Sequence, residues 1–337
     1  MKILFLYYDP HPAHEAMAKA VGADFFPAPK LKSGKKGIAY NIIGTTKIIK
    51  SAISIPRDYD VYLCEGTYIF PALAKKLGLI KNAKIINILA SPLLYYIKTG
   101  VIKGPRKKFA LRMLKLVDGF VCMGKMEEKL IKEIIPDANT MVAYPFIMPA
   151  LYKRILKYQK LPNLNSHKIL FIGKQDAYYK GLDILVLAFK EIKKKWPDAE
   201  LRIAGKIKDA EKYINDLDGV RLLGFVKDIV HIMKDSAVYV HPGRGDAFPV
   251  SSLEAMLAGL PTIVSVDTGT SEVVQQITKR MVVGLDSTEV YNAIDWYFKL
   301  NNMKRMILSK RSIEIGKNFE EKRIVRKFQL DFNKLKN

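Results

Sequence analysis

The feature of this sequence that most constrains its fold is an alternation of short apolar runs with segments of helical period. In the first half, four apolar runs close at Gly, Ser or Asp, and helical patterns such as "KKFALRMLKLV" follow them; the runs are "KILFLYY", "DYDVYLCEG", "AKIINILAS" and "VDGFVCMG". Because neighbouring parallel strands must be joined by a crossover, usually a helix, this order predicts a parallel sheet covered on both faces.

The alternation is interrupted around residues 145–165 and then starts again. Two prolines and a polar stretch break it, and further strands are expected at "KILFIG", "AELRIAG", "VRLLGFV", "AVYVHPG", "PTIVSV" and "MVVGL". We therefore predict an α/β fold in which two Rossmann-like domains, 1–150 and 151–320, face each other across a cleft. The helical stretch 321–337 is long enough to pack back on the first domain. In such open sheets, ligands bind at the carboxyl ends of the strands.

The chain carries a formal net charge of +23, and both halves are basic. Such an excess favours anionic partners, namely nucleic acid, acidic lipid headgroups or phosphorylated substrates. Two stretches of the first domain contain basic residues and no acids; they hold Lys30, Lys32, Lys35, Lys36, Lys47 and Lys50, and Lys98, Lys103, Arg106, Lys107, Lys108, Arg112 and Lys115. Nucleic acid is disfavoured as the partner because the chain has no zinc-ligand pattern, no RNP-like aromatic motif and no helix-turn-helix punctuation.

The first of these basic stretches also has an apolar side. Ile38, Ile42, Ile49 and Ile53 fall on one face of the predicted helix. Two interpretations stand equally: the helix lies on an anionic membrane surface, or it is solvated and its isoleucines pack on the sheet.

Several classes of site are disfavoured by what the sequence lacks. Cys64 and Cys122 are far apart in apolar runs, which indicates buried strand thiols in a reducing compartment, with no disulfide and no metal site. No apolar run has the ~18–20 residues of a membrane span, and we interpret the N-terminal run as a strand, not a signal peptide. We expect a cytoplasmic protein, peripheral on the cytoplasmic face of the membrane if the basic helix binds lipid. No G-x-G-x-x-G follows the first strand, which argues against a nicotinamide cofactor.

Two strand ends in the second half carry residues suited to a phosphate. Gly173 and Lys174 directly follow one predicted strand, and Lys180 precedes a glycine that opens a helix. Two ammonium groups beside a glycine-flanked turn suit a diphosphate, although in so basic a chain both could be solvated surface lysines. Another strand ends in Thr268, Gly269 and Thr270, small residues that let backbone amides approach a ligand.

The stretch "RGDAFPVSSLEAMLAGLP" places two acids across one loop and the helix after it. Ser251 or Ser252 is predicted to cap this helix, whose free N–H groups can bind an anion. Glu254 is then expected in the first turn, a position that is favourable for an acid in itself. Asp246, eight residues earlier, has no such helix-end explanation.

These motifs resemble those of the retaining GT-B glycosyltransferases of family 4. The signature of that family has the form E-G-F-P-x-x-L-L-E-A-M-A-x-G-x-P, and this sequence has D-A-F-P-V-S-S-L-E-A-M-L-A-G-L-P. "FIGK" with "KG", and "GTSE", match two further motifs in the same order. The resemblance covers most of 165–275 and, over 1–150, only the general layout.

The resemblance implies a metal-independent enzyme that takes a sugar from a UDP- or GDP-linked donor and requires no cofactor. Glu254 is then expected to bind the ribose hydroxyls, Lys174 and Lys180 the diphosphate, and Asp246 the transferred sugar. Phe248 and Pro249 stiffen the turn between the two acids. The remaining donor contacts are expected at Gly173, Ser251, Gly269 and Thr270. The acceptor is expected to be a sugar, lipid-linked or phosphorylated.

The sequence departs from the family pattern on the acceptor side. Many members have a His-Asp pair after a first-domain strand, where this chain has Ala90 and Ser91. His11 and His14 follow the first strand, in place of the glycine pair of the family, and are the candidates to face the acceptor. Two alternatives stay open: a GT-B relative such as a phosphorylase or a nucleotide-sugar epimerase, and, more distantly, a non-catalytic module that binds membrane or nucleic acid.

Overall fold

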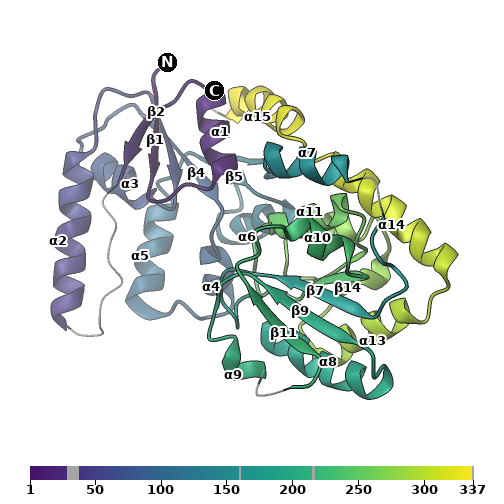
Figure 1. The fold of residues 1–337 in the computed structure, drawn as a ribbon. Coiled ribbons are helices and arrows are strands. Elements are labelled where there is room, and N and C mark those ends of the chain that lie inside the picture. Colours follow the sequence, from purple (N-terminus) through teal and green to yellow (C-terminus); the bar gives the residue numbers. More distant parts are fainter. Residues whose placement is uncertain (29–37, 159–160, 215–216, 336–337) are drawn as a thin grey trace. The chain divides into compact units, whose positions relative to one another are not determined.

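The computed structural model describes residues 1–28, 38–158, 161–214 and 217–335 (Figure 1). The chain forms two compact units, Met1–Pro145 with Ile324–Asn337, and Phe146–Arg323. We call them unit 1 and unit 2. The unit boundaries fall within a few residues of the expected 150/151 and 320/321.

Unit 1 is built on a parallel six-stranded sheet in the order β2-β1-β3-β4-β5-β6. Its strands are β1 (Ile3–Tyr7), β2 (Asp24–Pro27), β3 (Val61–Glu65), β4 (Lys84–Leu89), β5 (Gly119–Cys122) and β6 (Thr140–Val142). Its helices are α1 (Pro12–Ala20), α2 (Ile38–Ser54), α3 (Ile69–Lys76), α4 (Leu93–Lys98), α5 (Gly104–Leu114) and α6 (Lys125–Ile134). The central strands β1, β3 and β5 are buried except at Tyr7 and Glu65, the last residues of β1 and β3, because they are otherwise apolar on both faces.

The C-terminal helix α15 (Glu321–Leu335) packs within unit 1, beside α1 (Figure 1). Phe328 and Phe332 are fully buried, and Leu335 would lie 3.2 Å from a Cβ placed on Gly119. Its amphipathic pattern of apolar residues every three to four positions explains why one face is buried.

Unit 2 is built on a second parallel sheet in the order β11-β9-β7-β12-β13-β14. Its strands are β7 (Lys168–Ile172), β9 (Glu200–Ala204), β11 (Val220–Gly224), β12 (Val238–His241), β13 (Thr262–Ser265) and β14 (Val282–Val283), with a separate pair β8 (Gln175–Asp176) and β10 (Ile207–Lys208). Its helices include α7 (Pro149–Lys157), α8 (Leu182–Lys195), α10 (Ile229–Lys234), α11 (Val250–Leu257), α12 (Ser271–Val274), α13 (Ser287–Phe298) and α14 (Asn302–Lys317). Because β12 lies between β7 and β13, the loops after these three strands meet at one edge. The predicted α/β fold with two Rossmann-like sheets is confirmed.

Two of the isoleucines of the basic helix α2 do not pack on the sheet, so the second interpretation is wrong for them. Ile49 and Ile53 are 39% and 48% exposed, whereas Ala52 and Ile55 are buried. The helix thus packs through a neighbouring face and leaves these two isoleucines accessible. The side chains of Ile38 and Ile42, and Lys30, Lys32, Lys35 and Lys36, lie outside the described part of the structure. No helix among the described residues is both long enough and apolar enough to cross a membrane.

Candidate active site

Three loops of unit 2 pack tightly at the carboxyl edge of its sheet, and glycines make this possible. A Cβ on Gly181, which has φ +74°, would lie 1.9 Å from the carbonyl oxygen of Pro242, and one on Gly269 would lie 1.6 Å from that of Ala247. The N–H of Gly269 donates to the carbonyl of Asp246 at 2.8 Å. This amide therefore binds within the protein, and the glycine at 269 serves loop packing.

Arg244 links the loop after β12 to the first turn of α8 and to the turn before that helix. Its guanidinium makes a two-pronged ion pair with Asp183, at 2.7 and 2.8 Å, and stacks 3.9 Å from the ring centroid of Tyr178. The hydroxyl of Tyr179 donates to the carbonyl of Gly245 at 2.8 Å. Bidentate Arg–carboxylate pairs are geometrically specific, so the two loops are held in a defined relation.

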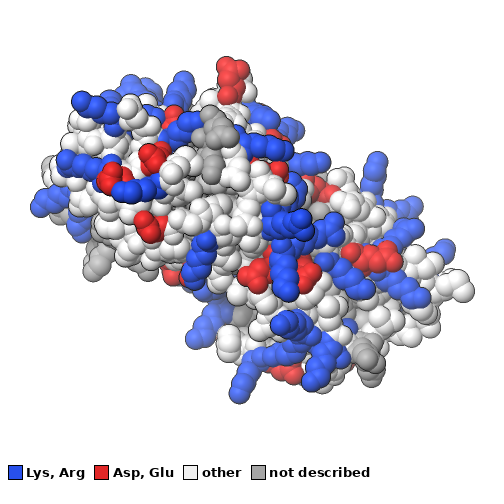
Figure 2. All heavy atoms as spheres, turned by 90° about the horizontal axis from the view of Figure 1, so that it is seen from above, with Lys and Arg blue, Asp and Glu red and all other residues white. Residues whose placement is uncertain are grey.

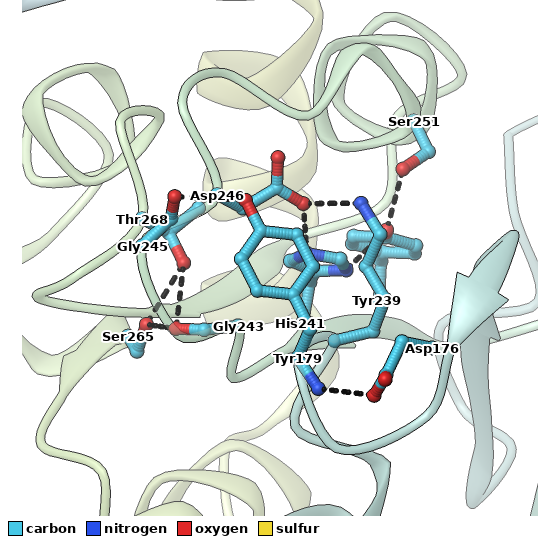
Figure 3. Close-up of polar contacts among 11 residues, drawn as sticks. Asp176, Tyr179, Tyr239, His241, Gly243, Gly245, Asp246, Ser251, Ser265 and Thr268 are labelled. Carbon is cyan, nitrogen blue, oxygen red and sulfur yellow. Dashed lines mark hydrogen bonds and ion pairs between the residues drawn. The ribbon is translucent and has the colours of Figure 1, made fainter. Parts of the chain in front are cut away.

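Asp246 lies inside this loop assembly and is 8% exposed. It contacts one cationic side chain and one hydrogen-bonding side chain. Its Oδ2 atom is 2.5 Å from Nζ of Lys180. The same atom is 3.0 Å from Nε2 of His241 (Figure 3). Burial opposes ionisation, but the Lys180 ammonium and the His241 hydrogen bond outweigh it and hold the pKa of Asp246 well below its usual range. Asp246 and Lys180, which the resemblance assigns to the sugar and the diphosphate, are therefore in direct contact.

His241 is a site residue that the sequence analysis did not identify. It is fully buried at the end of β12, and its Nδ1 atom lies 3.4 Å from the hydroxyl of Tyr239, which lies 2.9 Å from Oγ of Ser251 (Figure 3). Burial lowers the pKa of His241, against the opposing effect of Asp246, so the imidazole is held neutral. A polar residue as the last position of a buried strand was the available signal.

The helix that carries Glu254 begins earlier than expected. It starts at Val250 with Pro249 as its N-cap and no capping side chain, so the prediction that Ser251 or Ser252 caps it is wrong. Glu254 consequently lies beyond the first turn, and the helix-end explanation for this acid does not apply. Burial raises the pKa of Glu254 to about 7. A half-buried carboxyl with this pKa calls for an explanation by function.

The structure places the other predicted donor residues around this cluster with different exposures. Lys174 follows β7 and is exposed. A Cβ on Gly173 would lie 2.9 Å from the Phe171 ring, which accounts for glycine at the strand end. Thr270 is buried, and its Oγ1 has no hydrogen-bond partner among the residues that the structure describes. Phe248 is 6% exposed, with its ring 6.0 Å from that of Phe319.

At the carboxyl edge of unit 1, a second histidine–carboxylate pair forms. His14, in α1, is 4% exposed, and its Nδ1 lies 2.8 Å from Oε1 of Glu65, within ion-pair distance but not aligned as a hydrogen bond. Its Nε2 lies 3.1 Å from the sulfur of Met123. His11 caps α1 through Nδ1, and its backbone N–H donates to Oε1 of Glu65 at 3.3 Å. The two histidines predicted to face the acceptor thus lie together, with Glu65, which sequence analysis missed.

Burial, and then the neighbouring His14, lower the pKa of His11, against a smaller opposing effect of Glu65. Ala90 and Ser91 follow β4, at the same edge of this sheet. The described residues of the chain contain no group of three or more His, Cys, Asp or Glu side chains that could hold a metal ion.

The geometry of unit 2 can be compared with known families. The model of the family "Glycosyl transferases group 1" matches residues 166–299, a range that includes Lys174, Lys180, His241, Asp246 and Glu254. This part of the chain is similar to the group 1 glycosyltransferases.

Curated proteins match the chain over about half of its length or less. The uncharacterised glycosyltransferase MJ1607 of Methanocaldococcus jannaschii is 32% identical over 207 residues, which cover 52% of this chain and 51% of the relative. An uncharacterised glycosyltransferase of Haemophilus influenzae is 27% identical over 177 residues, 48% of this chain and 49% of the relative. Phosphatidyl-myo-inositol mannosyltransferase of Mycolicibacterium smegmatis is 33% identical over 103 residues, 29% of this chain and 27% of the relative. The chain spans about half, or less, of the length of the curated relatives it matches.

Solved structures share the fold over the whole chain. Anabaena Alr3699/HepE in complex with UDP and glucose has a TM-score of 0.69 at 15% identity, with 99% of this chain and 100% of that chain covered. Sucrose-phosphate synthase from Thermosynechococcus elongatus has a TM-score of 0.75 at 15% identity, with 99% of each chain covered. The predicted GT-B fold is confirmed.

Proposed function

We propose that this protein is a retaining glycosyltransferase that moves a sugar from a nucleotide-sugar donor to an acceptor. The observation that carries the proposal is the buried cluster of Lys180, Asp246 and His241, which lies within the range matched by the family. It combines a cation, an ionised carboxylate and a neutral imidazole at the edge where α/β sheets bind ligands.

The donor half follows from these side chains. Glu254 accepts hydrogen bonds from ribose hydroxyls, which favour its ionised form. Lys180, with Lys174 beside the same strand end, neutralises the diphosphate as negative charge develops on the leaving group, a contact that is stronger in the transition state. Asp246 accepts from hydroxyls of the transferred sugar. The lysines supply the positive charge, so we propose neither a metal ion nor a cofactor.

The donor nucleotide is proposed to be UDP- or GDP-linked. Support for a uridine nucleotide comes from Anabaena Alr3699/HepE, which was solved with UDP and glucose.

The acceptor is proposed to bind unit 1, near His11, His14 and Glu65. A lipid-linked acceptor is supported by the names of several relatives, which are phosphatidyl-myo-inositol mannosyltransferases. A phosphorylated acceptor would also suit the basic side chains that project from much of the surface, as Figure 2 shows.

We propose that unit 1 docks on an anionic membrane surface, on the cytoplasmic side of the membrane. The helix α5 and its flanks bear Lys103, Arg106, Lys108, Arg112 and Lys115, and contain no acid between residues 93 and 117. Phe109 of α5 and Ile49 and Ile53 of α2 are 39% to 48% exposed and give the surface an apolar component. Basic residues near anionic lipid contribute about 1 kcal/mol each.

The donor assignment is tested by calorimetric titration of UDP- and GDP-linked sugars. Wild type is expected to bind one class, and Lys180→Ala and Glu254→Ala to bind it at least about 10-fold more weakly. Unchanged binding in both variants would contradict the assignment.

Product NMR should show a retained anomeric configuration, and inversion would contradict the mechanistic class. A reaction that yields a sugar phosphate or an epimerised donor would favour the phosphorylase or epimerase alternative.

The membrane assignment is tested by co-sedimentation with vesicles that contain anionic lipid, at low and high salt. Arg106→Glu with Lys108→Glu should weaken binding, whereas Lys310→Glu on α14 should leave most of it. Equal loss in both proteins would contradict a surface on α5.

A further inference from the structure

The two partners of Asp246 are held very differently. His241 lies on β12 with its ring stacked against the ring of Phe171 on β7, at a centroid distance of 5.7 Å and an angle of 12°. On the same strand, two residues away and therefore on the same face, the ring of Tyr239 is parallel to it at 6.3 Å and 5°. The imidazole is therefore fixed in a buried aromatic layer.

The hydrogen bonds of this layer have one consistent direction. The ionised Asp246 can only accept, so Nε2 of His241 carries the proton that it donates at 3.0 Å. Nδ1 then accepts from the hydroxyl of Tyr239, and that hydroxyl accepts from Ser251 at 2.9 Å. The chain from Ser251 to Asp246 fixes the tautomer of His241 and the orientation of the carboxylate together.

Lys180 is the contrasting partner. It belongs to the turn before α8, and its side chain is 18% exposed. Its ammonium group lies at the end of a flexible four-carbon stem. Its Nζ contacts the same Oδ2 atom that His241 contacts. An ammonium group that moves onto a diphosphate must weaken its contact with Asp246, whereas the imidazole has no freedom to leave.

We propose that His241 is the positioning residue of Asp246, held by Tyr239 and Ser251, and that Lys180 exchanges Asp246 for the diphosphate when the donor binds. This inference rests on the proposed function, because it assigns Asp246 to the sugar and Lys180 to the phosphates. The imidazole keeps the carboxylate in place for the sugar after the lysine has moved. Without His241, the carboxylate would follow Lys180, and binding of the diphosphate would compete with binding of the sugar.

The test separates the sugar contribution from the nucleotide contribution. Calorimetry on the full chain gives the Kd for UDP and GDP and for UDP-glucose and GDP-mannose, and the ratio of nucleotide Kd to nucleotide-sugar Kd measures what the sugar adds. His241→Phe is expected to lower this ratio about 10-fold, the effect of one buried hydrogen bond to a charged group, while UDP or GDP alone binds as before. Lys180→Ala should instead weaken binding of the free nucleotide.

Three further variants keep the result interpretable. His241→Gln retains an N–H donor and should restore most of the ratio. Tyr239→Phe removes one hydroxyl and should lower the ratio less than His241→Phe does; it also serves if the latter fails to fold. His167→Gln is the matched control, because His167 pairs with Asp198 at 2.8 Å at the start of β7, the opposite end of the strands, and should leave the ratio unchanged.

The outcomes distinguish the role of His241 from the proposed function. An unchanged ratio in His241→Phe and Tyr239→Phe, or an equal fall in His167→Gln, overturns the role of His241 while the proposed function stands. Failure of the wild type to bind any nucleotide sugar overturns both.

Discussion

Each unit buries one histidine beside one carboxylate at the carboxyl edge of its sheet, and the two pairs differ in how completely they are hydrogen-bonded. In unit 2, both ring nitrogens of His241 face oxygen atoms, and Asp246 also has Lys180. In unit 1, the second nitrogen of His14 faces the sulfur of Met123, a weak acceptor, and Oε2 of Glu65 has no hydrogen-bond partner among the described residues.

This difference suggests different tasks for the same pair of groups. A fully hydrogen-bonded network holds a carboxylate still, as binding of a donor sugar requires. A pair with unused hydrogen-bonding capacity can still accept a bond or a proton from a ligand. We therefore expect variants of the unit 2 pair to alter donor binding, and variants of the unit 1 pair to alter use of the acceptor.

The largest expected effect is that of Lys180→Ala. Loss of a charge aimed at the leaving group should lower kcat by about 100-fold or more, measured as transfer at saturating donor. Lys174→Ala is the comparison variant. Lys174 is also assigned to the diphosphate but is exposed, so its effect should be at least about 10-fold smaller. Equal losses in the two variants would contradict this difference between the lysines.

His14→Gln is expected to affect only the acceptor side. If the pair with Glu65 takes the acceptor proton, transfer should fall by about 100-fold, the usual size of general base catalysis, while donor affinity stays constant. Transfer rates and donor titrations on the same preparation check this. A parallel loss of donor affinity would remove the contrast between the units, and unchanged transfer would leave His14 with a structural role alone.

Sequence reasoning was sufficient for the sheets; it nominated Asp246, Lys180 and Glu254 as site candidates, and it did not find the side chains that Asp246 and His14 contact. The sheets follow from apolar runs that are buried wherever they occur, and the charged residues follow from motif spacing. His241 and Glu65 each end a buried strand, and only the order of strands decides what a strand end meets. The start of the helix was predicted too late, because serines are common N-cap residues and two of them follow Val250. In the structure Pro249 is the N-cap, and Ser251 instead hydrogen-bonds to Tyr239 of β12.

Glu254 should make the stability of the folded protein depend on pH. Burial raises its pKa to about 7, whereas in the unfolded chain it is about 4.3. The folded state therefore binds the proton more strongly, and stability is lost as the pH rises from about 4.3 to about 7. Glu254→Gln removes this loss, which the pH dependence of Tm would show against wild type.

The same carboxyl must be ionised to accept from ribose hydroxyls, so donor affinity should rise with pH up to about 7. Below that pH, nucleotide binding should release a proton. Calorimetry near about pH 6 in two buffers of different ionisation enthalpy measures this release. Release that persists in Glu254→Gln would assign it to another group, and affinity independent of pH would remove Glu254 from the nucleotide site.

The smallest effects on sugar transfer are expected from the substitution of two glycines, one in each unit. In Gly269→Ala, the new Cβ would overlap the carbonyl of Ala247, so the loops after β12 and β13 must separate, at a cost of about 1–3 kcal/mol. In Gly22→Ala, nothing lies within 4 Å and only the positive φ of +71° is strained, which costs about 1 kcal/mol. Thermal unfolding should show a fall of a few degrees for each.

The donor titration should then separate these variants more clearly than the unfolding does. Gly269→Ala moves the loop that carries Asp246, because the N–H of Gly269 donates to the carbonyl of Asp246. The sugar contribution to donor binding should therefore fall in Gly269→Ala and persist in Gly22→Ala. If both variants kept it, the close packing of the unit 2 loops would contribute to stability and not to the position of Asp246.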